Sequence, residues 1–311
     1  MNNSVRSVFQ VDWHIFMAGV QTWLEGRSPY AQLNADFSAG AFAYPPTALP
    51  WLALFLPLGA WWYYVWTALQ LGGWWLIARR HGRSQLALLV WTPLMLNVYL
   101  GQNTLAVVLI VWAATRAKQR GWWWGLALAL AMTKPQVALV PGLWLLWHDR
   151  HAQGRWRLWS GIVVGTLVLA LPPTIMKPGI WIDWLVSLGT YRDRVLQVGA
   201  WQGASVVVLL LAAYVWHHSG RGGWQWWVAA GLFPHVSYYS IVALLPVLQP
   251  RQHYWTLGGL ALAGLCVGPV TEVTLSWLLA VHMLAAWMIN GGPMQQPAPM
   301  PTPVTPLKQP G

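Results

Sequence analysis

Charged residues are scarce in this chain of 311 residues, and acidic residues are the scarcest, with 7 against 18 basic ones. Only 8% of the residues are charged, compared with roughly a quarter in an average soluble domain, whereas 57% are hydrophobic. So few charges could not cover the surface of a water-soluble protein of this size. Apolar runs recur from about residue 46 to residue 290, separated by short basic loops. We therefore predict an all-α, polytopic integral membrane protein.

Cysteine is almost absent as well, and the acids do not cluster. The single cysteine, Cys266, lies in an apolar run, which excludes an internal disulfide and a thiolate metal site. No cofactor and no obligatory metal site are predicted, because no group of carboxylates is close enough in sequence to form one. The net charge of +11 comes from basic residues in loops between apolar runs. We interpret it as a topology signal facing anionic membrane lipids and not as a nucleic-acid surface.

Tryptophan, by contrast, is abundant. Many of the 27 tryptophans stand in pairs or triples at the ends of apolar runs, as at 61–62, 74–75, 122–124 and 226–227. This placement is typical of aromatic belts at the two membrane surfaces. A general compositional bias toward tryptophan is the alternative interpretation.

The apolar runs predict about 11 membrane segments, with a range of 10 to 12. Residues 121–147 and 224–248 could each form one long kinked helix or a hairpin of two helices. Three strongly basic loops, at 79–83, 116–120 and 148–157, favour hairpins if all three face the cytoplasm. The predicted segments are 60–78, 85–100, 103–115, 121–133, 136–147, 158–173, 200–216, 224–234, 236–248, 255–268 and 273–289.

This topology places the turns at 101–103 and 133–135 and the loop at 176–198 on the extracytoplasmic side. The loop then breaks the rule that basic residues stay inside, so its basic residues need another explanation. They are Lys177, Arg192 and Arg194.

Three regions are predicted along the chain. Residues 1–44 form an extracytoplasmic segment, with an amphipathic surface helix over about 9–24. Residues 45–290 form the transmembrane domain, which opens with a short, proline-rich interfacial or half-inserted helix at 44–59. Residues 291–311 are rich in proline and glutamine and are predicted to be a disordered tail.

Two titratable residues stand at predicted helix breaks within the transmembrane region. Lys134 lies between two apolar helices and precedes Pro135, and a lysine buried there needs a partner or an anion such as phosphate. The alternative is a lysine whose ammonium group snorkels to the membrane surface. His235 follows Pro234 in a similar setting, and the alternative for it is a purely structural histidine.

Other polar residues on the same predicted side have simpler explanations too. Gln102 and Asn103 could only cap the helix that follows them. Asp12 and Glu25 could be ordinary acids on a solvated helix face. Their collection on one side of the membrane nonetheless favours a reaction at that surface over a conduction path.

Taken in order, five motifs make the chain resemble glycosyltransferase family 87, which belongs to the GT-C superfamily and includes polyprenyl-phosphomannose-dependent α-mannosyltransferases. They are VDWHIFMAGVQTWLEGRSPY at 11–30, YPPTALPWLALFLPL at 44–58, GQNTLAVVLI at 101–110, GLALALAMTKPQVALVPGLWLLW at 125–147 and FPHVSYYSIVALLPVL at 233–248. The resemblance implies a GT-C-type helical bundle in the cell membrane, with an extracytoplasmic active site.

The resemblance also implies a reaction. An inverting hexosyltransferase would move a hexose, mannose above all, from a polyprenyl-phosphate donor to a lipid or glycan acceptor. GT-C enzymes use an acid of the first outer loop as the base, and Asp12 stands there. Lys134 with Arg192 or Arg194 would bind the donor phosphate, and His235, Gln102, Asn103 and Tyr44 would complete the substrate site.

The chain departs from the family pattern at its N-terminus. Family members have a transmembrane helix before the acid motif, whereas eleven residues precede Asp12, so we expect either a misplaced start of the chain or a missing first helix. Two other classes of protein stay open: a non-catalytic or truncated protein that binds polyprenyl lipid, and a lipid or solute transporter.

Overall fold

The computed structural model describes residues 11–30, 42–80, 92–117, 119–152, 154–197, 214, 223–231 and 242–247. Every regular element in these ranges is a helix, which confirms the predicted all-α class for this part of the chain. The predicted tail at 291–311, the segments at 255–268 and 273–289, and most of the segment at 200–216 lie outside the described residues.

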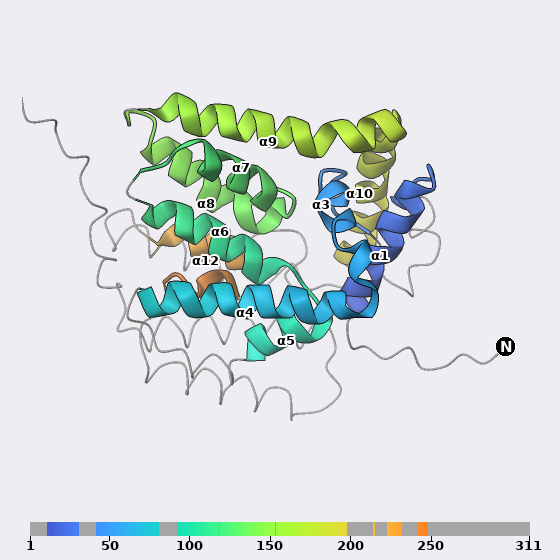
Figure 1. The fold of residues 1–311 in the computed structure, drawn as a ribbon, viewed down its shortest axis with the longest axis horizontal. Helices are drawn as coiled ribbons and strands as arrows, with labels where there is room; N and C mark the ends of the chain where they lie inside the picture. Colours follow the sequence, from blue (N-terminus) through green and yellow to red (C-terminus); the bar gives the residue numbers. More distant parts are fainter. Residues whose placement is uncertain are drawn as a thin grey trace, which may run out of the picture.

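The helices are arranged in two directions. Helices α4, α6 and α9 run along the long axis of the molecule, whereas α1 and α10 run across it at one end (Figure 1). The elements are α1 (Val11–Leu24), α3 (Ala48–Ala53), η2 (Leu56–Trp61), α4 (Trp62–Arg80), α5 (Thr92–Leu100), α6 (Thr104–Arg116), α7 (Trp122–Ala131), α8 (Pro135–His148), α9 (Arg155–Met176), α10 (Ile180–Gln197) and α12 (Trp224–Gly231).

Helix α1 confirms the helix predicted near the N-terminus, and its end has a simple cause. Gly26 adopts a left-handed φ of 74°, its N–H donates to Trp23 O at 2.9 Å, and the Arg27 N–H donates to Thr22 O at 3.0 Å. This pair of bonds is a Schellman motif, which needs glycine at the left-handed position. Glu25 beside it is exposed and pairs with Arg27, so Glu25 belongs to the turn that ends the helix.

The hairpin interpretation of residues 121–147 is also confirmed. Helix α7 ends at Ala131, and Lys134 has a non-helical backbone with φ −124° and ψ 74° before α8 starts at Pro135. A residue before proline is driven out of the helical region by contact with the proline ring, whereas proline itself suits the first helical position. The Lys134-Pro135 pair therefore divides the stretch into two helices.

The segment at 176–198 was predicted as an outer loop, and the structure shows that it is helical from residue 180 to residue 197. It forms α10, an 18-residue helix that begins three residues after Lys177 ends α9. Asp183 in its first turn suits the positive end of the helix dipole and lies 3.5 Å from Lys177 Nζ. This ion pair supplies the missing explanation for Lys177.

Two groups of buried side chains meet where α1 crosses the bundle. The first, which we call the main core, joins α6, α7, α8 and α12. The second, the aromatic cluster, joins α1, α3 and the start of α4 around Trp13, Phe16 and Trp62. Ala106 of α6 and Leu130 of α7 pack against the aromatic cluster, so the turns that precede α6 and follow α7 lie at the junction of the two groups.

Small residues bring α7 and α9 into backbone contact. A Cβ placed on Gly161 would lie 2.1 Å from Trp122 O, and one on Gly125 would lie 2.2 Å from Leu158 O. Gly165, one turn after Gly161, faces Ala129, one turn after Gly125, with its Cβ position 2.8 Å from the Ala129 Cβ. Small residues four apart on both helices are the packing pattern of membrane helices, where they allow close backbone approach.

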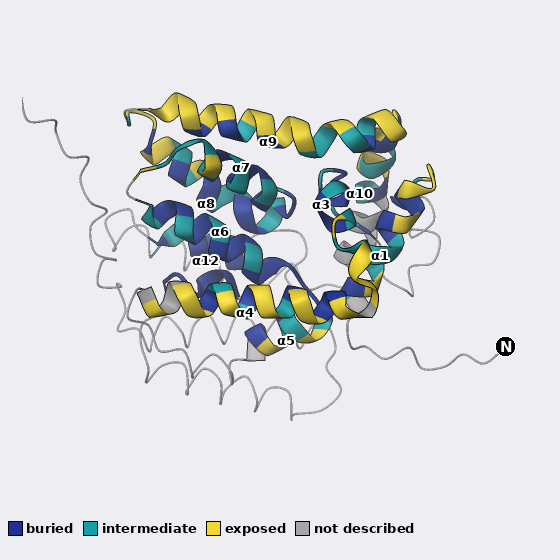
Figure 2. Cartoon of the chain, viewed as in Figure 1, coloured by how far each residue is buried: buried dark blue, intermediate teal, exposed yellow. Residues whose placement is uncertain are grey.

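The outer faces of α9 and α4 are exposed and apolar (Figure 2). Helix α9 is the one helix among the described residues that is long and apolar enough to cross a membrane, and only 28% of its most apolar window is buried. Exposed side chains along it include Trp156, Val168 and Ile175, at 72%, 61% and 74%. An apolar surface of this extent is not expected to face water.

The close approach of α7 and α9 predicts the effect of one added methyl group. Gly161→Ala should lower the free energy of unfolding by about 1–3 kcal/mol, because the new Cβ meets the backbone of Trp122. Gly142→Ala is the matched control, since it is also inside a helix and nothing lies within 4 Å of its Cβ position. Thermal unfolding of both variants in lipid nanodiscs measures the difference, and equal Tm values would contradict this packing.

A buried ion pair fastens the end of the bundle opposite to α1. Both oxygens of Asp149 lie 2.5 Å from Arg120 Nη1, and the same guanidinium group donates to Ala114 O and Thr115 O at the end of α6. The two side chains are 14% and 9% exposed. Arg120, which we predicted only as part of a basic loop, therefore ties the ends of α6 and α8 together.

Removing one partner of this pair leaves the other charge buried. We expect Arg120→Ala to lower the free energy of unfolding by about 3 kcal/mol. Arg150→Ala is the control, because Arg150 is exposed and its guanidinium group contacts only Trp147 among the described residues. Chemical unfolding of the two variants is the measurement, and a similar small loss in both would show that Arg120 is not a structural clamp.

Candidate active site

Five polar side chains come together where α1 crosses the bundle. They arrive from four places: the start of α1, the segment before α3, the turn between α5 and α6, and the turn between α7 and α8. These five residues, which we call the polar cluster, are Asp12, Tyr44, Gln102, Asn103 and Lys134. All five were predicted from the sequence as candidate site residues, and they lie up to about 120 positions apart in the chain.

Lys134 is the centre of the polar cluster. Its side chain is 1% exposed, so its ammonium group does not snorkel to a surface. Lys134 Nζ donates to Gln102 Oε1 at 2.5 Å and to Tyr44 Oη at 3.0 Å, and it lies 5.4 Å from the centre of the Tyr44 ring. These two partners are neutral groups, and the charge of Asp12 also acts on the ammonium group.

Gln102 links the cation to the acid. Its carboxamide oxygen accepts from Lys134 and, at 2.9 Å, from the Tyr44 hydroxyl. Its side chain also hydrogen-bonds the carboxyl group of Asp12, which is half-buried at the first turn of α1. Since the oxygen of the carboxamide is occupied by two donors, its NH₂ group is the part that faces Asp12.

Burial shifts the pKa values of Asp12 and Lys134 toward each other. Desolvation lowers the pKa of Lys134 from 10.5 to about 7, and the nearby Asp12 charge opposes this shift. Desolvation raises the pKa of Asp12, against the hydrogen bond from Gln102 and the charge of Lys134. An acid with a raised pKa beside a base with a lowered one is typical of sites that transfer protons near neutral pH.

Asn103 occupies the N-cap position of α6, but its side chain does not cap the helix. Its Oδ1 instead accepts from the Tyr44 hydroxyl at 3.4 Å. The interpretation of Gln102 and Asn103 as a mere helix cap therefore fails for the side chains. The next residue, Thr104, is fully buried, and its hydroxyl has no hydrogen-bond partner among the described residues.

Two buried carboxamides that were not predicted from the sequence contact the turn between α5 and α6. Gln70 of α4 is 2% exposed and Asn97 of α5 is 0% exposed. Both side chains donate to Gln102 O, at 3.1 and 3.4 Å, and both accept a backbone N–H of α6. Single amide side chains inside apolar runs were the signal that could have identified them.

The remaining predicted site residues lie elsewhere or outside the described part. Arg192 and Arg194 lie in the last two turns of α10, where the structure describes the backbone and not the side chains. His235 lies outside the described residues. The start of α10 does approach the cluster, because Trp184 Nε1 donates to Ala43 O at 3.2 Å, next to Tyr44.

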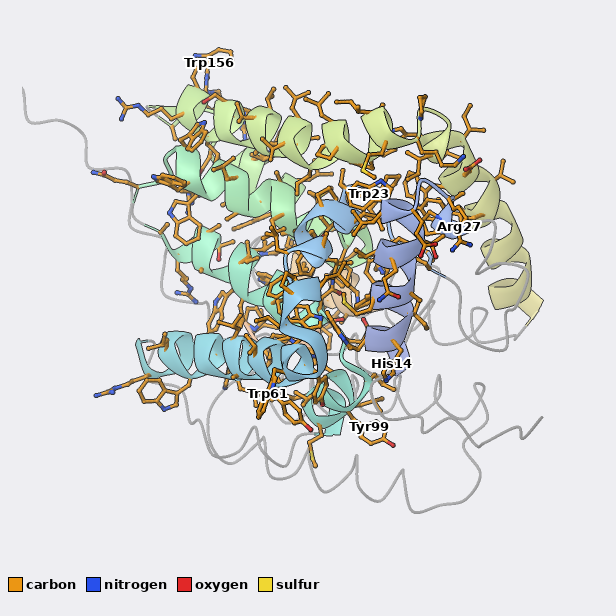
Figure 3. The ribbon with its side chains drawn as sticks, turned by 45° about the vertical axis from the view of Figure 1, so that its right-hand side comes forward. His14, Trp23, Arg27, Trp61, Tyr99 and Trp156 are labelled. Atoms are coloured by element: carbon orange, nitrogen blue, oxygen red, sulfur yellow. The ribbon has the colours of Figure 1, made fainter. Side chains whose placement is uncertain are left out.

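A cavity of about 400 Å³ opens beside the polar cluster, between α1 and the start of α4. Trp13, His14 and Gln21 line it from α1, and Trp62 lines it from α4. Since successive helical residues are rotated by about 100°, His14 and Gln21 leave α1 on the side away from Asp12. His14 indeed projects outward from the start of the helix (Figure 3). The cavity therefore does not lie on the side of α1 that carries Asp12.

In this arrangement, Asp12 as a base and Lys134 as a fixed cation lie on opposite sides of the Gln102 carboxamide. Such a pair can take a proton from an attacking group and stabilise an anionic leaving group. Among the described residues, no three His, Cys, Asp or Glu side chains form a group that could hold a metal ion. The fold and the cluster together define an all-helical protein with a charged polar site enclosed by apolar helices.

Comparison with protein families identifies the chain. The model of glycosyltransferase family 87 matches residues 42–271, which is 230 of the 311 residues. The chain belongs to glycosyltransferase family 87, and the resemblance noted from its motifs is confirmed. No curated protein and no solved structure matches it.

The family match covers most of the polar cluster. Tyr44, Gln102, Asn103 and Lys134 lie within residues 42–271, whereas Asp12 precedes the matched region. Asp12 is therefore connected to the site by the geometry of α1 and Gln102, and not by the family model.

Because burial lowers the pKa of Lys134, we expect its charged form to lower the free energy of unfolding. Lys134→Met keeps the side-chain volume and removes the charge, and Gln102 Oε1 keeps its bond from the Tyr44 hydroxyl. In the natural chain the unfolded state binds this proton more tightly, so stability rises with pH between about 7 and 10.5. We expect the variant to gain roughly 1 kcal/mol or more at pH 6 and to lose most of this gain by pH 10.

Unfolding in nanodiscs at both pH values measures this difference. Lys177→Met is the control, because the Lys177 side chain is 30% exposed and pairs with Asp183. A loss of stability at pH 6 in Lys134→Met would mean that the ammonium group has a structural role.

Proposed function

We propose that this protein is a polytopic membrane glycosyltransferase that moves a hexose, most simply mannose, from a polyprenyl-phosphate donor to a hydroxyl group of a lipid or glycan acceptor. Membership of glycosyltransferase family 87 establishes the transfer of a sugar. One observation supports an anionic lipid donor above the others: the ammonium group of Lys134 is buried at the N-terminus of α8, where Tyr44 and Gln102 orient it.

In the proposed reaction the acceptor oxygen attacks the anomeric carbon of the donor. The new carbon–oxygen bond forms on the face opposite to the phosphate, so the anomeric configuration inverts. The bond from the anomeric carbon to the phosphate oxygen breaks, and polyprenyl phosphate leaves with the electron pair. Asp12 accepts the proton of the acceptor hydroxyl, for which its raised pKa makes it a better base than an exposed aspartate.

Lys134 is assigned to the negative charge that grows on the phosphate. A fixed cation away from water stabilises such a charge more strongly than an exposed one would. The N-terminus of α8 points at the same place, because Lys134 is the N-cap residue of that helix, and its dipole also favours an anion. A bound phosphate would raise the pKa of Lys134 from about 7 and hold it in the charged form.

Arg192, Arg194 and His235 are further proposed ligands of the donor phosphate or the acceptor. The two arginines lie on α10, whose first turns contact the segment that ends at Tyr44. Gln102, Asn103 and Tyr44 are proposed to orient the donor. No obligatory metal is needed in this scheme, because Lys134 supplies the positive charge.

The proposed membrane arrangement follows from the two helix directions. If α4, α6 and α9 cross the bilayer, then α1 and α10 lie along one membrane surface, at the end that carries the polar cluster (Figure 1). The exposed apolar residues of α10, Ile182, Leu185 and Val186, suit a helix at that surface. The basic loops at the far ends of α4, α6 and α8 would face the cytoplasm, so the proposed site is extracytoplasmic.

The reaction is tested with Asp12→Asn. The variant keeps the size of the side chain and removes the base, so we expect sugar transfer to fall by about 10²- to 10⁴-fold. The assay follows radiolabelled mannose from polyprenyl-phosphate-mannose into lipid-linked product in membranes that contain the protein. Glu25→Gln is the matched control, because Glu25 is an exposed acid just after the same helix and pairs only with Arg27 among the described residues.

Each outcome separates the alternatives. Full activity in Asp12→Asn would place the base elsewhere, with Asp183 as the next acid to test. No transfer by the natural chain from this donor, together with tight binding of polyprenyl phosphate, would favour a protein that binds the lipid without catalysis.

A further inference from the structure

We propose that Gln70 and Asn97 are positioning residues that cap α6 in place of Asn103 and so keep the Asn103 side chain free to bind a hydroxyl group of the donor hexose. This inference rests on the proposed function for its ligand. The capping arrangement itself depends only on the hydrogen bonds of the turn between α5 and α6.

The first turn of α6 obtains its caps from two other helices. Asparagine is one of the best N-cap residues, because its side-chain oxygen can accept from the second or third backbone N–H of the helix. Asn103 holds the N-cap position and makes no such bond. Asn97 Oδ1 accepts instead from Leu105 N at 3.3 Å, and Gln70 Oε1 accepts from Ala106 N at 3.2 Å.

The same two carboxamides hold the turn from its other side. Gln70 Nε2 and Asn97 Nδ2 both donate to Gln102 O, at 3.1 and 3.4 Å. Asn97 Nδ2 also donates to Gln70 Oε1 at 3.4 Å, and Asn97 O accepts from Gln102 N at 2.8 Å. Because both side chains are buried, each of these bonds is protected from competition with water.

As a result, the side chains of Asn103 and Thr104 at the start of α6 do not cap the helix. Among the described residues, the Asn103 side chain has one hydrogen bond, the 3.4 Å bond from the Tyr44 hydroxyl, which is long for an O–H donor. The Thr104 hydroxyl beside it is buried and has no partner among the described residues. A carboxamide and a hydroxyl can both donate and accept, which suits sugar hydroxyls better than phosphate. Lys134, on the other side of Tyr44, is left for the phosphate.

Loss of either outside cap should make Asn103 change its role. In Gln70→Met the Ala106 N–H has no acceptor, and the nearest replacement is the Asn103 side chain in its usual N-cap rotamer. The helix would then be capped normally, but the carboxamide would be withdrawn from the substrate. A merely structural Gln70 would produce no such exchange.

A double-mutant cycle between Gln70→Met and Asn103→Ala tests this exchange with two readouts. In the natural background we expect Asn103→Ala to lower kcat/KM for polyprenyl-phosphate-mannose about tenfold and to leave Tm nearly unchanged. In the Gln70→Met background the same change should lower Tm by about 2–4 °C, because it removes a working cap, and should cause no further loss of kcat/KM.

The controls fix the interpretation. Val111→Ala, a core change two turns further along α6, should lower Tm and leave the effect of Asn103→Ala unchanged in both readouts. Gln70→Glu keeps an acceptor for the Ala106 N–H, so Asn103→Ala should not affect Tm in that background. If Gln70→Met does not fold, Asn97→Ala takes its place in the cycle, because it frees the Leu105 N–H.

Equal Tm shifts for Asn103→Ala in the natural and Gln70→Met backgrounds would overturn the inference. The Tm readout does not depend on catalysis, so it also applies if the natural chain transfers no sugar from this donor. In that case the expected Tm coupling would support the capping exchange while the proposed function fails.

Discussion

The burial of the Lys134 ammonium group is the constraint on which the site end of the molecule depends. A lysine that is 1% exposed must be surrounded by oxygens, and here they come from Tyr44 and Gln102, which lie far away in sequence. Pro135 determines the position of Lys134, because the proline is the first residue of α8 and Lys134 is its N-cap residue. The turn between α5 and α6 must then lie opposite Lys134, and α1 must bring Asp12 to the far side of Gln102.

The rigid framework behind this turn explains how such a site persists among apolar helices. Gln70 and Asn97 bond to each other and accept two backbone N–H groups in the first turn of α6, so these buried amides are satisfied without water. On the other side, glycines allow the backbones of α7 and α9 to pack in direct contact. This contact fixes the position of α7 and so of the turn at Lys134 that follows it.

The sequence identified the members of the polar cluster but not the network that holds it. Proline, glycine and lysine at helix breaks leave local signals, and these predicted the α7–α8 hairpin and the end of α1 correctly. The function of Gln70 and Asn97 depends on which turn they face, and spacing along one helix does not contain that information. Helix α10 was missed because its charges resemble a loop, although Ile182, Leu185 and Val186 recur at a helical spacing.

The two ends of the bundle surround their buried cations with different groups. At the basic end, the guanidinium group of Arg120 faces the carboxylate of Asp149, and two backbone carbonyls complete its shell. That charge is neutralised, and the pair serves the fold. At the site end, Lys134 has two neutral oxygens as hydrogen-bond partners, and the acid reaches it through Gln102. Burial of the Lys134 ammonium group costs stability, so stability alone does not account for a lysine at this position. The proposed reaction would use both residues, with Lys134 facing an anionic leaving group and Asp12 facing an attacking hydroxyl group.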